Sequence, residues 1–184
     1  MIKHVYCIRH GKSTHNVDYQ NRGIEAYTDP IHEDANLVPL GIQQAAKLSS
    51  EWNEKNNIDL IITSPLLRTM DTTVHIFKNT NKPVIVLDEV REFPLGSHIT
   101  NKRKPKDYLE KVYPEFDLSN IPEEAAEMEK ETIDNLKQRV NQTKKIIKSL
   151  NAKNIALVCH SSFLKEFLET DDNICHCEPI LFEL

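Results

Sequence analysis

Apolar residues recur along the chain in two patterns, short continuous runs and helically spaced sets. The short runs are typical of buried strands and occupy 2–8, 59–63, 83–87, 154–159 and 180–184. The helically spaced sets predict helices over 40–52, 66–78, 123–150 and 161–168. Ser64 and Pro65 are placed as the cap and first-turn residues of the second helix. Residues 12–39 are expected to be polar and irregular, and 88–121 is the least regular of the later segments.

Strands that alternate with helices predict an α/β fold. The expected architecture is a three-layer αβα arrangement whose central sheet is mostly parallel and covered on both faces. The length of 184 residues suits a single domain over 1–184, and no internal repeat is visible.

Composition and charge narrow the class of protein. A hydrophobic content of 39% with 28% charged residues is typical of a soluble globular chain, and the net charge of -5 argues against nucleic acid as a partner. No window approaches the roughly 20 apolar residues of a membrane helix, so no membrane partner is expected. The first residues lack a secretory pattern and the four cysteines lack disulfide-rich spacing, so a cytoplasmic location is expected. The sequence does not indicate an oligomeric state.

Residues able to bind and transfer a phosphoryl group follow the predicted strands. Ligands of open α/β sheets bind beyond the carboxyl ends of the strands, so the residues found there are expected to share one rim. The residues after the first four strands are Arg9, His10, Ser13 and Asn16; Ser64 and Arg68; Arg91 and Glu92; and His160 and Ser161.

These residue types suit phosphate chemistry. Guanidinium groups bind phosphate oxygens through forked, charge-assisted hydrogen bonds, and helix N-termini add N–H donors. A neutral imidazole can attack phosphorus, and a carboxylic acid can protonate the leaving oxygen. Enough fixed positive charge can replace a metal, so no metal and no cofactor are expected.

Several motifs resemble the histidine phosphatase superfamily, which includes the cofactor-dependent phosphoglycerate mutases. The segment 8–13 with Asn16 resembles its opening motif, 63–69 its arginine motif, and 158–161 its second-histidine motif. The segments 34–45 and 91–103 resemble a eukaryotic branch of small phosphatases. The resemblance runs from Ile2 to about Phe167 in the family's order.

The resemblance implies a role for each matching residue. His10 is the expected nucleophile and Glu92 the proton donor, while Arg9, Arg68 and His160 form the phosphate pocket. Asn16 and the backbone around Ser161 are further expected donors, and Ser13 is a further expected substrate-binding residue. Glu89 competes for the acid role, and Glu92 is preferred because its spacing to Gly96 matches that of the family.

Three other features have alternative interpretations. The basic run Lys102, Arg103, Lys104 and Lys106 is either a solvated face or a contact for the non-phosphate end of the substrate, with Arg103 and His98 the best candidates. Cys175-His176-Cys177 invites a metal hypothesis, but zinc sites favour wider cysteine spacing and four ligands. Cys7 and Cys159 are expected to fill the core, and His4, His15, His32 and His75 to be surface or structural residues.

Hydrolysis is the favoured reaction, on a small phosphorylated metabolite as the partner. The segment after Glu92 is shorter and less aromatic than in the family's mutases, which argues against a phosphoglycerate mutase. Phosphoserine is the first candidate substrate and 3-phosphoglycerate the second. A catalytically inactive phospho-ligand binding module is the alternative of another class, and the presence of His10, Arg68 and His160 argues against it.

Overall fold

A five-stranded sheet forms the centre of the protein, in a computed structural model that describes residues 2–125 and 130–184. The strands are β1 (His4–Arg9), β2 (Leu60–Thr63), β3 (Val84–Val86), β4 (Asn154–Cys159) and β5 (Pro179–Glu183). Their order is β3-β2-β4-β1-β5, with β1 to β4 parallel and β5 antiparallel to β1. All five predicted strands are present.

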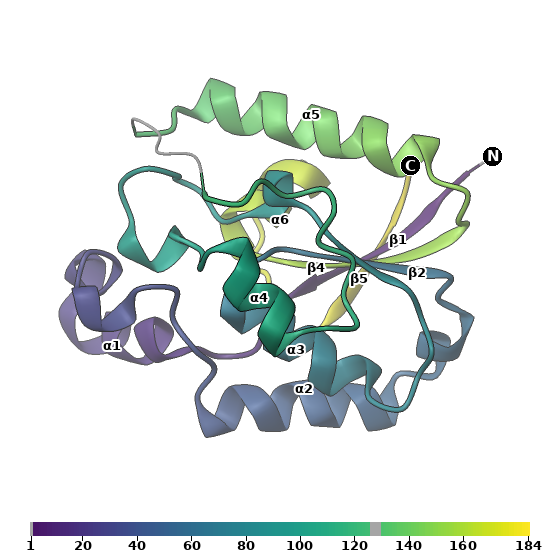
Figure 1. The fold of residues 1–184 in the computed structure, drawn as a ribbon, viewed down its shortest axis with the longest axis horizontal. Coiled ribbons are helices and arrows are strands. Elements are labelled where there is room, and N and C mark those ends of the chain that lie inside the picture. Colours follow the sequence, from purple (N-terminus) through teal and green to yellow (C-terminus); the bar gives the residue numbers. More distant parts are fainter. Residues whose placement is uncertain (1, 126–129) are drawn as a thin grey trace.

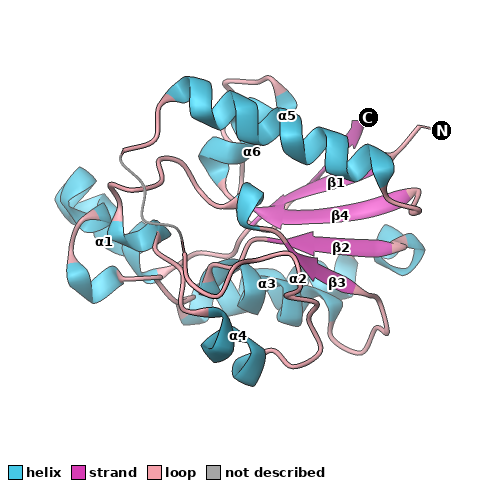
Figure 2. Ribbon diagram, turned by 45° about the horizontal axis from the view of Figure 1, so that its top comes forward, coloured by secondary structure: helices cyan, strands magenta, loops and turns pink. Residues whose placement is uncertain are grey.

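Helices cover both faces of this sheet (Figures 1 and 2). On one face, α5 (Ile133–Ser149) and α6 (Ser161–Leu168) pack on β1 and β4 through a large apolar cluster that contains the buried Cys7 and Cys159. On the other face, α2 (Pro39–Glu51) and α3 (Leu67–Phe77) form a second cluster with the same strands. The predicted three-layer α/β fold is therefore confirmed.

Two helices lie in segments that were expected to be irregular. The first is α1 (Thr14–Arg22), followed by 3-10 turns at Gly23–Tyr27 and Pro30–His32; only His15 of α1 is buried. A helix with one buried side chain has no apolar stripe, so hydrophobic periodicity does not reveal it. The second is α4 (Lys106–Val112), which packs on α3 mainly through Leu109.

One predicted helix start and one predicted helix cap are wrong. The helix predicted over 123–150 begins only at Ile133, where Thr132 accepts a hydrogen bond from the Asn135 N–H as its cap. Residues 122–125 and 130–132 are not helical, and 126–129 lie outside the described residues. The helix predicted over 66–78 is α3, which begins at Leu67 with Leu66 as its cap residue. Ser64 is not the cap, because it continues the sheet ladder by donating its N–H to the Val158 carbonyl.

A close backbone approach fixes the loop after β1. A Cβ added to Gly11 would lie 2.5 Å from the Gly41 carbonyl oxygen, and one added to Gly41 would lie 2.1 Å from that of Lys12. The loop can therefore pack on α2 only with glycine on both sides. None of the helices in the described residues is long and apolar enough to cross a membrane.

Candidate active site

His10 and His160 face each other at the carboxyl ends of two adjacent strands. His10 directly follows β1, His160 directly follows β4, and the His10 N–H donates to the Cys159 carbonyl at 3.0 Å. The two ring centroids are 5.2 Å apart. The ladder between β1 and β4 thus brings together two histidines that are 150 residues apart in the sequence.

The hydrogen bonds of His10 leave one ring nitrogen free to react. Nδ1 lies 2.7 Å from the Gly11 carbonyl oxygen, and because a carbonyl only accepts, Nδ1 carries the proton. Nε2 therefore holds the lone pair. Burial lowers the pKa of His10 well below its usual value, and Arg68 and His160 act in the same direction. The ring is neutral at physiological pH, as a nitrogen nucleophile must be.

Arg68 is a fully buried cation beside these histidines. Its Nη1 donates to the Thr100 carbonyl at 2.6 Å, and its Nη2 donates to Asn101 Oδ1 at 3.0 Å. Burial lowers the pKa of Arg68 to about 10, so the guanidinium remains charged at neutral pH. Arg9 is held by a bond from its Nη1 to the Ile174 carbonyl at 2.8 Å.

Several polar atoms of this cluster, two of them arginine donors, have no partner among the described residues. Among the described residues, Arg9 Nε, Arg68 Nε and His160 Nδ1 are buried without a hydrogen bond. Unpaired buried polar groups are costly and rare in folded proteins. We call Arg9, His10, Arg68 and His160 the phosphate pocket, after the role that the sequence predicts for them.

Glu92 reaches the site from a loop and binds the start of α6. Its carboxylate accepts the Ser162 N–H at 3.1 and 3.2 Å and the Phe163 N–H at 3.2 Å. Its charge also acts on the pKa of both Arg9 and Arg68, which places it beside the phosphate pocket. Two of the backbone donors expected around Ser161 are therefore occupied by Glu92. Glu89, the competing acid, is not among the main influences on either arginine.

Ser13, His15 and Asn16 form a closed hydrogen-bond network at the start of α1. Asn16 Nδ2 donates to His15 Nε2 at 3.0 Å, so His15 Nδ1 carries the proton and donates to Ser13 Oγ at 3.0 Å. The Ser13 hydroxyl then donates to Asn16 Oδ1 at 2.7 Å. The Ser13 hydroxyl proton is used within this network, and a substrate-binding role for Ser13 stays a prediction. Asn16 retains a second amide proton, and its substrate role stays a prediction.

Arg103 is buried inside the fold, which contradicts the prediction that it contacts substrate. Its side chain is 0% exposed, and Nε donates to Asp88 Oδ1 at 2.9 Å. Its other nitrogens donate to the Lys104 and Pro122 carbonyls at 2.9 and 2.6 Å. Arg103 ties together residues 88–104, which we call the acid loop because they contain Glu92.

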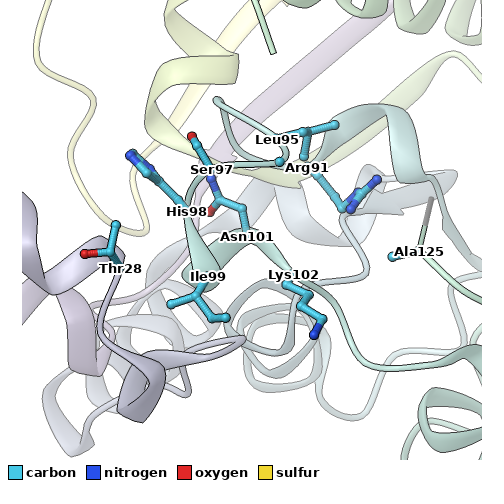
Figure 3. Close-up of a pocket in the computed structure, with 10 residues that line it drawn as sticks. Thr28, Arg91, Leu95, Ser97, His98, Ile99, Asn101, Lys102 and Ala125 are labelled. Atoms are coloured by element: carbon cyan, nitrogen blue, oxygen red, sulfur yellow. The ribbon is translucent and has the colours of Figure 1, made fainter. Parts of the chain in front are cut away.

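A cavity of about 500 Å³ is lined mainly by the acid loop (Figure 3). His98 forms part of its wall and stacks on Tyr27, with ring centroids 4.7 Å apart. Asn101, which holds Arg68, forms another part. This loop cavity therefore shares residues with the support of the phosphate pocket, and a substrate role for His98 stays a prediction.

His176 is a neighbour of the site that the sequence did not indicate. Its Nδ1 donates to the His10 carbonyl at 2.6 Å, its ring lies 5.5 Å from that of His10, and burial lowers its pKa to about 4. The next residue donates its N–H to the Arg9 carbonyl at 2.9 Å. The pattern of Cys175 and Cys177 on either side of His176 suggests metal binding rather than this contact. Among residues 2–125 and 130–184, no group of three or more His, Cys, Asp or Glu side chains is arranged to hold a metal ion.

Comparison with known proteins identifies the family of this chain. A model of the histidine phosphatase superfamily (branch 1) matches residues 5–171. The chain therefore belongs to the histidine phosphatase superfamily, and it is an enzyme of the phosphatase class.

Individual relatives are distant. Phosphoglycerate mutase-like protein 1 of Arabidopsis thaliana is 28% identical over 208 residues, which cover 95% of this chain and 73% of that protein. The crystal structure of the ecdysone phosphate phosphatase from Bombix mori has a TM-score of 0.71 at 14% identity, covering 97% of this chain and 88% of that one. Phosphoserine phosphatase from Entamoeba histolytica, solved with 3-phosphoglyceric acid, has a TM-score of 0.58 at 22% identity, covering 97% and 94%. At these identities the solved structures show the shared fold.

Proposed function

We propose that this protein is a metal-independent phosphomonoester hydrolase that acts through a phosphohistidine on a small phosphorylated metabolite. The observation that carries the proposal is the neutral, buried His10 surrounded by polar atoms of Arg9, Arg68 and His160, including two arginine Nε donors, that lack partners among the described residues. A phosphate dianion satisfies those donors and lies next to the lone pair of His10 Nε2. The fixed charge of two arginines stabilises the transferring oxygens.

The reaction has two steps. His10 Nε2 attacks phosphorus, the phosphorus–oxygen bond of the ester breaks, and Glu92 gives a proton to the leaving oxygen. The ionised Glu92 then takes a proton from water, whose oxygen attacks phosphorus and breaks the phosphorus–nitrogen bond. Phosphate leaves, His10 is neutral again and Glu92 is protonated.

Phosphoserine is the first candidate substrate and 3-phosphoglycerate the second. Support comes from the cationic side chains near Glu92 and from the solved relative named phosphoserine phosphatase. A cofactor-dependent mutase is disfavoured by the short segment after Glu92, and a mutase reaction is one outcome of the test.

Turnover on a panel of phosphorylated metabolites tests the proposal. We expect phosphate release in EDTA, no isomerisation of 3-phosphoglycerate with or without 2,3-bisphosphoglycerate, and loss of activity in His10→Ala. A phosphoryl group trapped on the protein should be labile in acid and stable in base. Activity retained by His10→Ala, or abolished by EDTA, would overturn the mechanism, and isomerisation would identify a mutase.

A further inference from the structure

Two cationic side chains line the loop cavity. Arg91 and Lys102 line it together with the polar residues Ser97, His98 and Asn101, and no Asp or Glu is among the described residues of its wall (Figure 3). A cavity of about 500 Å³ is within the range that small-molecule sites occupy, about 300–1,000 Å³. Its charge and size suit an anionic organic group.

Two polar atoms of this wall lack partners. Arg91 is only 6% exposed, yet its Nε is buried without a hydrogen bond among the described residues, and so is Ser97 Oγ. Both atoms can donate a proton, and an acceptor in the cavity would satisfy them. The phosphate pocket likewise contains buried arginine Nε atoms without partners among the described residues.

The carboxylate that pairs with Arg91 also pairs with a second arginine. Asp88 is shared between Arg91, at 3.5 Å from Nη2, and Arg103, at 2.9 Å from Nε. The nearby Glu131 is bonded twice to Arg139, at 2.8 and 3.0 Å. Burial lowers the pKa of Arg91, which Asp88 raises and Arg103 and Arg139 lower further. Among the described residues, Asp88 is thus the one carboxylate that forms an ion pair with Arg91, and it lies closer to Arg103 than to Arg91.

The position of the loop cavity connects it to the reaction. Its wall includes Asn101, whose side chain holds Arg68 of the phosphate pocket, and His98, which stacks on Tyr27. Tyr27 in turn contacts His15, which lies 6.3 Å from His10 between ring centroids. The acid loop also supplies Glu92, which faces the leaving oxygen in the proposed reaction. The leaving group is thus the part of the substrate that this wall can meet.

We propose that the loop cavity is the specificity site for the leaving group and that it binds a carboxylate through Arg91, Lys102 and Ser97. The inference rests on the proposed hydrolase function and defines its substrate class as carboxylated phosphate monoesters. It also replaces Arg103, which is used inside the fold, with Arg91 and Lys102 as the cations that contact substrate.

Binding to His10→Ala protein, which does not depend on turnover, tests this site. Two matched pairs differ in the carboxylate: phosphoserine with phosphoethanolamine, and 3-phosphoglycerate with glycerol 3-phosphate. By calorimetry we expect the carboxylated member of at least one pair to bind about ten- to a hundredfold more tightly, the range of a charge-assisted hydrogen bond. Lys102→Met and Ser97→Ala should each reduce that preference.

Lys104→Met is the matched control, because Lys104 belongs to the same basic run but does not line the cavity. It removes the same charge and should leave the preference unchanged, which separates contact from long-range attraction. Equal affinities within both pairs, no binding of all four esters, or a preference untouched by Lys102→Met and Ser97→Ala would overturn the inference. Wild-type hydrolysis of p-nitrophenyl phosphate, lost in His10→Ala, tests the proposed function separately.

Discussion

The phosphate pocket and the acid loop meet at one rim of the sheet, but different interactions hold them. In the phosphate pocket, His10 and His160 directly follow β1 and β4, so the ladder between parallel strands fixes their backbone positions. Residues 88–104, all of which are described, contain no strand, and the buried Arg103 and the partly buried Arg139 hold them in place. Arg139 donates to the carbonyls of Glu89 and Arg91, two residues that come shortly before Glu92 in the chain.

This difference separates two tasks of a phosphatase. Every phosphate monoester presents the same phosphoryl group, and the rigid ladder holds the groups that meet it. Leaving groups differ between substrates, and a loop fixed by side chains can change with few consequences for the sheet. Substitutions in the phosphate pocket should therefore affect the turnover of all esters, whereas those in the acid loop should affect stability or the choice of ester.

The largest effect is expected at Arg68. Arg68→Met removes a buried cation from the phosphate pocket, and we expect kcat/KM to fall about a thousandfold for every ester, the upper end of the loss for one stabilising donor. Arg68→Lys should recover only part, because one ammonium cannot replace the planar pair of bonds to Thr100 and Asn101. Steady-state kinetics on p-nitrophenyl phosphate measures both. A loss below about tenfold in Arg68→Met would place the phosphate elsewhere.

Arg103 should affect stability before activity. Arg103→Met removes the closer of the two arginines that pair with Asp88, and this arginine is buried. We therefore expect the free energy of unfolding to fall by about 3 kcal/mol. Urea unfolding followed by circular dichroism measures the change. The neighbouring Lys102 is exposed, so Lys102→Met should alter stability by less than about 0.5 kcal/mol. A stable Arg103→Met protein with weakened substrate binding would restore the original prediction for Arg103.

These two residues also show what the sequence can and cannot predict. Apolar runs identify all five strands, and the residues after them include the whole phosphate pocket, because parallel strands bring their carboxyl ends to one rim. A basic run has the same sequence pattern whether its members are exposed, as Lys102 is, or buried, as Arg103 is. Only the tertiary fold, which places Asp88 beside Arg103, distinguishes them.

Two features that the sequence did not reveal, the helix α1 and the role of His176, also depend on the tertiary fold. The helix α1 buries one side chain and has no apolar stripe, so its cap at Ser13 is the only local sign. The role of His176 depends on a segment that returns to β1 from the far end of the sequence, a contact that no local pattern encodes.

Glu92 should separate esters by their leaving groups. With phosphoserine, whose alkoxide must be protonated, we expect Glu92→Gln to lower kcat about a hundredfold. With p-nitrophenyl phosphate, whose leaving group is stable as an anion, the loss should be below about tenfold. Equal losses on both esters would show that Glu92 only positions α6, through its bonds to Ser162 and Phe163.

Glu89→Gln is the matched control for this prediction. Glu89 is three residues earlier in the same loop, and its carbonyl, rather than its carboxylate, is bonded to Arg139. The substitution should leave the ratio of the two kcat values within about twofold of wild type. A leaving-group effect in Glu89→Gln, with none in Glu92→Gln, would exchange the roles of the two acids.

The smallest effect is expected at His176, which we infer to be a positioning residue for His10. His176→Leu removes the donor to the His10 carbonyl, and we expect kcat to fall about tenfold with little change in KM, because one orienting hydrogen bond is lost. His176→Asn places an amide N–H where Nδ1 lies and should restore most of kcat. If His176 only fills space, Leu should be tolerated at least as well as Asn. If His176 contacts the phosphate, KM should rise in both variants. The phosphate pocket would then include His176 in addition to the residues that the strand ladder holds.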